Sequence, residues 1–179
     1  MYNHYLEQLE GRYKSLWNIK RDVVINEWKV DLLSKFVARY ERYVLTKKAK
    51  IGSAQTDIYD IVITAPQELT LKELHKLEQM GKDFIGVEVI PSFEHMCTEV
   101  RLVLIGAGYT EDVIKYAKEY SYTKNYLWGL KGWTTLIFIL VDVKNGVVYA
   151  HPELKDKDRE IYMPSLEMRE RCSLILEGV

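Results

Sequence analysis

Hydrophobic and polar positions follow two different periods along the chain. Over residues 2–17, Tyr and Leu residues recur at steps of three and four, the spacing of one face of an amphipathic helix. Residues 19–64 instead carry runs rich in Val, Ile, Tyr and Phe, which are typical of strands. This change of period predicts an N-terminal helix followed by a meander of at least three strands.

Polar residues mark the expected turns of this meander. KFVARY at residues 35–40 and YVLTKKAKI at residues 43–51 flank a short polar turn around Glu41. DIYDIVIT at residues 57–64 follows the polar stretch GSAQ and is expected to be the next strand.

Lys47 is the unusual residue of the strand expected at 43–51. Because side chains alternate between the two faces of a strand, Lys48 and Lys50 would face solvent while Lys47 shares the apolar face. An ammonium group there must reach water, line a wet cavity or pair with a carboxylate. Asp60 would lie opposite Lys47 if the following turn is centred on residues 53–54, whereas a later turn would remove that pairing.

The second half of the chain alternates between helix and strand patterns. Thr70 and Glu73 form a capping box before an amphipathic run, and nearly continuous apolar runs are typical of buried strands. Asn-Gly between apolar runs is a strong hairpin signal. The expected elements are a helix from Thr70 to Gly86, a strand at 100–106, a helix from Thr110 to Tyr120, a strand at 134–143, a hairpin through Asn145–Gly146 into 147–151, a charged loop at 153–160 and a short helix from Ser165.

The order of these elements, α-β-β-β-α-β-α-β-β-α, indicates the fold class. It predicts an α+β fold with one mixed, mostly antiparallel sheet and helices packed on it. No repeat or linker divides the sequence, so we expect residues 1–179 to form a single globular domain. Within that domain, residues 153–179 would form the charged loop and the short C-terminal helix.

Composition and charge narrow the class of protein. The 179 residues are 47% hydrophobic, and 25 basic against 26 acidic residues give a net charge of −1. This balance gives no electrostatic reason to expect nucleic acid or an anionic membrane as a partner. The longest apolar run, LIFILV, is far shorter than the ~20 residues that span a bilayer. The N-terminal residues lack the basic and then apolar order of a signal peptide, so we do not expect them to act as one. Cys97 and Cys172 form no CxxC pattern, so we expect reduced thiols and a cytoplasmic location.

A loop with two tryptophans is the preferred ligand site. LWGLKGW at residues 127–133 places Trp128 and Trp133 around two glycines and Lys131. Aromatic side chains beside a flexible basic loop can stack on a ligand, although they can equally anchor a bend into the following strand. Lys47, Trp128, Lys131 and Trp133 are therefore the candidate ligand-binding residues, with the lysines supplying charge and the tryptophans stacking area.

Metal and cofactor sites have weaker support. If EHMCTE at residues 94–99 is extended, His95, Cys97 and Glu99 share one face, but zinc sites need three or four protein ligands. A structural histidine and a buried thiol are the alternative. IGAGYTED at residues 105–112 has the placement of a dinucleotide-binding turn, yet acids at the start of the following helix would repel a pyrophosphate. We therefore expect no cofactor and no metal.

One alternative function is enzymatic. DVVINEWK contains Asp22, Glu27 and Lys29, and nucleases of the restriction-endonuclease-like fold use such groups to hold Mg²⁺ and orient water. The predicted helix, three strands, helix, strand order also resembles that core. However, the spacing from Asp22 is short, and Glu27 lies before the long hairpin.

Three stretches carry a resemblance to a protein family. ERYVLTKKAKI, EHM and GLKGW resemble signatures of an uncharacterised protein family of clostridia-like anaerobic bacteria, and the likeness spans roughly residues 4–150. The resemblance implies a bacterial cytoplasmic protein. The family has no known activity, so the resemblance transfers no functional residues.

The leading hypothesis is a non-catalytic α+β domain that binds a small molecule or a partner protein. The alternatives are the metal-dependent nuclease and a structural homodimer formed through sheet edges or the C-terminal helix. The sequence leaves open whether the protein is an enzyme, although it favours a binding role.

Overall fold

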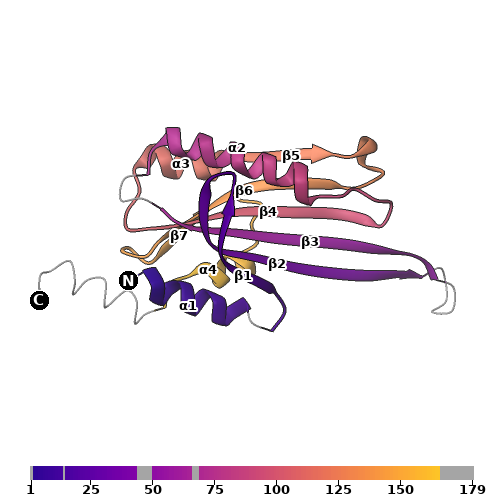
Figure 1. The fold of residues 1–179 in the computed structure, drawn as a ribbon, viewed down its shortest axis with the longest axis horizontal. Coiled ribbons are helices and arrows are strands. Elements are labelled where there is room, and N and C mark those ends of the chain that lie inside the picture. The colour runs from indigo at the N-terminus through magenta and orange to yellow at the C-terminus, as the bar shows by residue number, and fades with distance from the viewer. Residues whose placement is uncertain (1, 14, 44–49, 66–68, 166–179) are drawn as a thin grey trace, which may run out of the picture.

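The computed structural model of the protein describes residues 2–13, 15–43, 50–65 and 69–165, which contain a seven-stranded sheet with helices packed against it (Figure 1). The elements are α1 (Tyr2–Tyr13), β1 (Asn18–Ile25), β2 (Trp28–Tyr43), β3 (Lys50–Thr64), α2 (Leu71–Glu88), β4 (His95–Gly106), α3 (Glu111–Glu119), β5 (Ser121–Asn125), the 3-10 turn η1 (Leu127–Gly129), β6 (Trp133–Asp142), β7 (Val147–Ala150) and α4 (Asp156–Tyr162).

Two kinds of strand pairing build the sheet. Its order is β1-β2-β3-β4-β6-β5, and β7 also pairs with β6. β3 and β4 are parallel, as are β4 and β6, and α2 and α3 lie in the connections between them. The remaining pairs are antiparallel. The α+β class and the mixed, mostly antiparallel sheet predicted from the sequence are confirmed.

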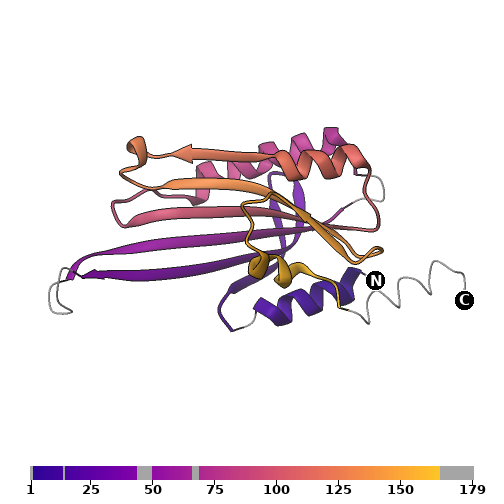
Figure 2. The ribbon, with the colours of Figure 1, turned by 180° about the vertical axis from the view of Figure 1, so that it is seen from behind.

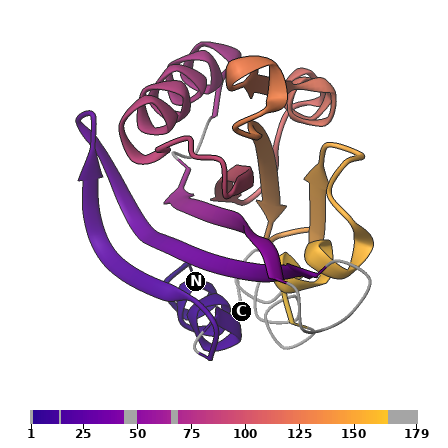
Figure 3. The same ribbon diagram turned by 90° about the vertical axis from the view of Figure 1, so that its right-hand side faces the viewer.

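Each face of the sheet has its own hydrophobic core. α2 and α3 pack on one face, whereas α1 and α4 pack on the other (Figure 3). α4 crosses the sheet next to α1 (Figure 2), and α1 places Tyr5, Leu9 and Tyr13 in the core beneath it. β2 and β3 extend beyond the covering helices, toward the right in Figure 1.

The N-terminus of α2 forms as its sequence predicts. The Thr70 side chain accepts a hydrogen bond from the Glu73 N–H, and the Glu73 carboxylate accepts one from the Thr70 N–H at 2.8 Å. The helix continues past Gly86 to Glu88 because Phe84 and Ile85 are buried against the sheet and hold its last turn. Neither α2 nor any other described helix combines the length and the apolar character that crossing a membrane requires.

The strand divisions expected in the meander are wrong. β2 runs unbroken through Glu41, where a turn is expected, and β3 starts at Lys50 instead of after GSAQ. Polar residues do not break β2, because this strand extends past the helices and its residues 39–41 are exposed to solvent. The tight turn of this region lies instead at Asn26 and Glu27, whose φ angles of 45° and 69° suit a two-residue hairpin between β1 and β2.

Lys47 lies in residues 44–49, outside the described part of the chain. Its place on an apolar face therefore stays a prediction. The strand register does not place Lys47 opposite Asp60, because the residue of β2 that pairs with Asp60 of β3 is Ser34.

Two further elements differ from expectation, and a third is not described. α4 begins inside the stretch 153–160, where a charged loop is expected, and it runs to Tyr162. It forms because buried Tyr162 anchors its end and Asp156 suits its N-terminal dipole. β5 is an additional strand whose mostly exposed side chains give no apolar alternation. The helix expected after Ser165 falls on residues 166–179, outside the described ranges.

Candidate functional site

A row of three polar side chains crosses the face of the sheet that α1 and α4 cover. The strand register aligns Ser34 of β2 with Asp60 of β3, and Asp60 with Arg101 of β4. The three residues are 0%, 0% and 1% exposed. Buried polar groups need partners, so the contacts of this polar row determine what it can do.

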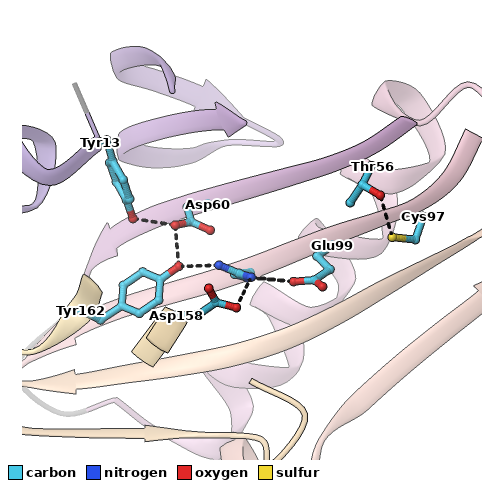
Figure 4. A network of polar contacts seen from close by, with 8 residues as sticks. Tyr13, Thr56, Asp60, Cys97, Glu99, Asp158 and Tyr162 are labelled. Atoms are coloured by element: carbon cyan, nitrogen blue, oxygen red, sulfur yellow. Dashed lines mark hydrogen bonds and ion pairs between the residues drawn. The ribbon is translucent and has the colours of Figure 1, made fainter. Parts of the chain in front are cut away.

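Asp60 is held by the two helices that cover it (Figure 4). The hydroxyls of Tyr13, at the end of α1, and Tyr162, at the end of α4, each donate to its Oδ2 at 2.6 Å. Burial raises the pKa of the Asp60 carboxyl, because the charged form has lost its solvation by water. Neither its Oδ1 nor the Ser34 Oγ makes a hydrogen bond with a described residue.

Arg101 links Tyr162 to two carboxylates. Its Nη1 donates to the Tyr162 hydroxyl at 3.2 Å, and its Nη2 lies 2.6 Å from Glu99 Oε2 and 3.5 Å from Asp158 Oδ2. Burial disfavours the charged guanidinium, but Tyr162, Asp60 and Glu99 outweigh burial and raise the pKa of Arg101. Arg101 therefore stays charged, and polar contacts lead from buried Asp60 to the partly exposed Glu99.

A cavity of about 260 Å³ lies beside Glu99 and Asp158. Its walls come from β4, β6, the segment before α4 and α4 itself. They include Cys97, Glu99, Trp133, Glu153, Lys155 and Asp158.

Cys97 is a buried free thiol on the wall of this cavity. Its Sγ donates a long hydrogen bond of 3.5 Å to the Thr56 hydroxyl on β3 (Figure 4). Burial raises the pKa of the Cys97 thiol. Because the thiolate is the nucleophilic and metal-binding form, this environment does not activate the sulfur.

His95 does not share a face with Cys97 and Glu99, contrary to the expectation for an extended EHMCTE stretch. A register shift at the start of β4 turns His95 to the side of Thr98, whose hydroxyl lies 2.8 Å from His95 Nε2. Its Nδ1 lies 2.8 Å from the Lys131 carbonyl oxygen. Within the described ranges, no group of three or more His, Cys, Asp or Glu side chains is arranged to hold a metal ion.

The α2–β4 and β5–β6 connections lie at the same end of the sheet (Figure 1), and both carry exposed apolar residues. Trp128 is 94% exposed and Phe93 is 75% exposed. Large exposed apolar side chains that lie near one another are typical of interaction sites. We define the tip as Ile90, Phe93, Leu127, Trp128 and Leu130, all of which are exposed.

The backbone that carries the tip is strained. Leu127 and Trp128 have φ angles of 48° and 52°, in the left-handed region that residues with a Cβ rarely adopt. A backbone hydrogen bond closes the base of the loop 127–131, where the Tyr126 N–H donates to the Gly132 carbonyl at 3.0 Å. A Cβ at Gly132 would lie 2.5 Å from the Met96 carbonyl oxygen, so the loop lies directly against β4.

The candidate ligand residues separate into two places. Trp128 and Lys131 lie in the loop of the tip, and the Lys131 Nζ lies 5.3 Å from the centre of the Phe93 ring. Trp133, at the start of β6, is 40% exposed and lines the cavity. Lys47 belongs to the residues that the structure does not describe.

The structure brings together two of the three residues of the nuclease alternative. Asp22 and Lys29 form an exposed ion pair at 3.6 Å between β1 and β2. Glu27 lies in the tight turn and lines a different hollow from that pair.

The glycine turn after β4 lines the mouth of another hollow. Gly108 and Thr110 lie there beside Thr70 at the N-terminus of α2, around a volume of about 710 Å³. Asp112 also lines this hollow, and its charge opposes the binding of an anion at the two helix N-termini.

The polar row and the Phe93 side of the tip were missed by the sequence reasoning. A signal for the polar row exists, because Asp60 and Arg101 occupy strand positions whose alternate neighbours, Val62 and Val103, are apolar and buried. A charged residue on the apolar face of a strand indicates a buried ion pair or hydrogen-bonded pair. Phe93 carries no comparable signal, because single apolar residues in loops are common.

Comparison with known proteins gives a family and no characterised relative. No curated protein and no solved structure matches the chain. A family model described as "Domain of unknown function (DUF8052)" matches residues 1–162, which is most of the chain. The protein belongs to this DUF8052 family.

Proposed function

We propose that this chain is a non-catalytic binding domain that docks on a partner protein through the tip. The observation that carries the proposal is Trp128, which combines a 94% exposed indole with a left-handed backbone. A left-handed φ destabilises the folded state by about 1–3 kcal/mol per residue. An indole that stays in water contributes no hydrophobic stabilisation to offset this strain. Neither property stabilises the isolated domain, so both are explained by a contact that Trp128 makes with another molecule.

The neighbours of Trp128 support a docking role. Phe93 and Leu130 extend the apolar surface, and a few aromatic side chains commonly supply most of the binding energy of a protein interface. Lys131 lies against Phe93, where its ammonium group can stay at the solvated rim of an interface. The candidate residues Trp128 and Lys131 thus act in one surface.

Charge favours a protein over the other partners of an apolar surface. Anionic membranes and nucleic acids attract clusters of basic residues, whereas the chain has a net charge of −1. Glu88 and Glu94 stand close to the tip in sequence and add negative charge there. A protein with an apolar groove has no such electrostatic requirement.

Site-specific photo-crosslinking tests this proposal. A photoreactive residue at position 128 or 93 should crosslink one common partner in cells, whereas the same residue at exposed Val24 on β1 should not. With that partner purified, Trp128→Ala should weaken binding by at least about tenfold, as for an interface hot spot, and Val24→Ala should leave it unchanged. Equal affinity of both variants would refute the proposal.

The homodimer alternative gives a different result in the same experiment. A crosslink from position 128 to a second copy of this chain would replace the partner protein with self-association. Light scattering at high micromolar concentration then separates a dimer from a monomer.

The metal-dependent nuclease remains the enzymatic alternative. The order α1-β1-β2-β3-α2-β4 matches the expected core, and Asp22 and Lys29 are close enough to act together. Incubation with DNA or RNA and Mg²⁺ or Mn²⁺ tests it. Cleavage that is lost in Asp22→Ala and Glu27→Ala would support the nuclease, and an inert wild-type protein would eliminate it.

A further inference from the structure

We propose that the cavity beside Glu99 and Asp158 binds a small organic cation, either an ammonium or a guanidinium compound. This site is separate from docking at the tip, because the cavity lies between β4, β6 and the α4 segment. Its volume of about 260 Å³ admits a small molecule and no folded partner.

The charge of the lining favours a cation. Glu99, Glu153 and Asp158 face the cavity, whereas Lys155 is the one basic residue among its described lining residues. Arg101 lies behind the wall and offsets one of the carboxylates. The remaining balance is negative, in a recess where charges are screened less than on open surface.

Two of the carboxylates are held in place before any ligand arrives. Arg101 contacts Oε2 of Glu99 through Nε and Nη2, and it contacts Oδ2 of Asp158 through Nη2. Tyr162 in turn contacts Arg101 from the buried side. The second oxygen of each carboxylate is not used by Arg101, so a ligand N–H group or methylammonium group can approach it without breaking the network.

Trp133 provides an aromatic surface for the cation, beside the carboxylates. Its half-exposed side chain lines the cavity that the three carboxylates also line. Cations bind to the face of an indole more strongly than to any other side-chain ring. A cavity that combines an indole with carboxylates therefore selects an organic cation over a neutral molecule of the same shape.

An anion and a metal ion fit these residues less well. The Arg101 side chain is 2% exposed and its donors already serve Glu99 and Tyr162, so it offers little to an incoming anion. A bare metal ion would gain nothing from the indole, and none of the described cavity residues belongs to a metal-binding cluster.

Calorimetric titration of the full chain tests the proposal with four probes. Choline and putrescine represent quaternary and primary ammonium compounds, methylguanidine represents guanidinium compounds, and dimethylbutanol is the neutral isostere of choline. We expect saturable binding of at least one cation below about 10 mM, no binding of the neutral isostere, and weaker binding at high salt. If no cation binds, or if dimethylbutanol binds as tightly as choline, the proposal is overturned.

Opposite charge changes in the cavity wall give the decisive comparison. Glu153→Gln should weaken cation binding about five-fold, whereas Lys155→Gln should strengthen it by a similar factor. Neither side chain contacts Arg101, and thermal unfolding confirms that each variant is folded. Trp133→Leu should also weaken binding, and Lys124→Gln, outside the cavity, should not. Shifts of the same sign in Glu153→Gln and Lys155→Gln would contradict the site.

Discussion

Asp60 and Arg101 are cross-strand neighbours in β3 and β4, and the hydroxyl of Tyr162 is hydrogen-bonded to both. The link joins a buried acid, a buried base and the end of α4. Such a network stabilises the fold only while all of its residues are present, because a buried charge without its partner is strongly unfavourable. Three predictions about stability follow from this contact.

Replacing Arg101 with Met should destabilise the protein strongly. The substitution removes the positive charge next to buried Asp60 but keeps most of the side-chain volume. Breaking a buried pair in this way costs about 3–5 kcal/mol. Urea unfolding monitored by tryptophan fluorescence measures the loss in free energy of unfolding.

The matched control removes both charges. The double variant Asp60→Leu with Arg101→Met should lose less stability than the sum of its two single variants, because neither charge is then left alone. Strictly additive losses would show that the two residues are not coupled.

Tyr162→Phe should cost about 1.5–3 kcal/mol, the usual value for a hydrogen bond to a charged group. The variant removes the hydroxyl that donates to Asp60 Oδ2 and accepts from Arg101, while the ring still packs under α1. Tyr40→Phe is the control, because Tyr40 is 55% exposed on β2 and should change stability by less than about 0.5 kcal/mol. Thermal or urea unfolding compares the two, and equal effects would argue against the network.

The pH dependence of stability reports the ionisation of Asp60. Burial raises the folded-state pKa of Asp60 above its usual value of 3.8, so the folded state holds this proton more tightly than the unfolded chain. The stability that protonation provides is present below pH 3.8 and is lost as pH rises through the raised folded-state pKa.

Comparison with Asp60→Asn isolates this effect from the other carboxylates. The free energy of unfolding of the wild-type protein, relative to Asp60→Asn, should fall as pH rises from about 4 to about 7. Urea titrations at each pH measure it. Parallel curves for the two proteins would mean that the pKa of Asp60 does not change on folding.

Two glycines of the tip loop should respond differently to alanine. At Gly132, φ is 77° and a Cβ would lie 2.5 Å from the Met96 carbonyl oxygen, so Gly132→Ala must displace the loop from β4. At Gly129, φ is 86° but the space is open, so Gly129→Ala should cost only the backbone strain of about 1 kcal/mol. Hydrogen exchange of the loop amides should increase in Gly132→Ala and stay close to wild type in Gly129→Ala. Similar exchange in both would contradict this packing.

The elements that could be predicted from the sequence are those with local signals. The capping box of Thr70 and the Asn145–Gly146 hairpin depend on residues a few positions apart, and both form. Glu41 was misinterpreted because local polarity cannot distinguish a turn from a strand that extends into solvent. α4 was missed because the burial of Tyr162 depends on Tyr5 and Asp60, far away in the sequence.

A candidate site could be predicted from the sequence only where its residues lie in one continuous segment. Trp128 and Lys131 stand in one loop, and the sequence alone identified that loop as a surface of interest. The cavity needs Glu99 from β4, Trp133 from β6 and Asp158 from α4. Their meeting depends on parallel strand pairing and on the packing of α4, which no short pattern encodes.

The two hydroxyls that enclose Asp60 have a consequence for biosynthesis. Tyr13 emerges early from a ribosome, whereas Tyr162 emerges only after every strand of the sheet has been made. Until then, one side of the buried acid stays open to water, because the nascent domain lacks α4. The enclosure of Asp60 is therefore complete only when α4 arrives, and this contact between distant parts of the chain is expected to form more slowly than local ones.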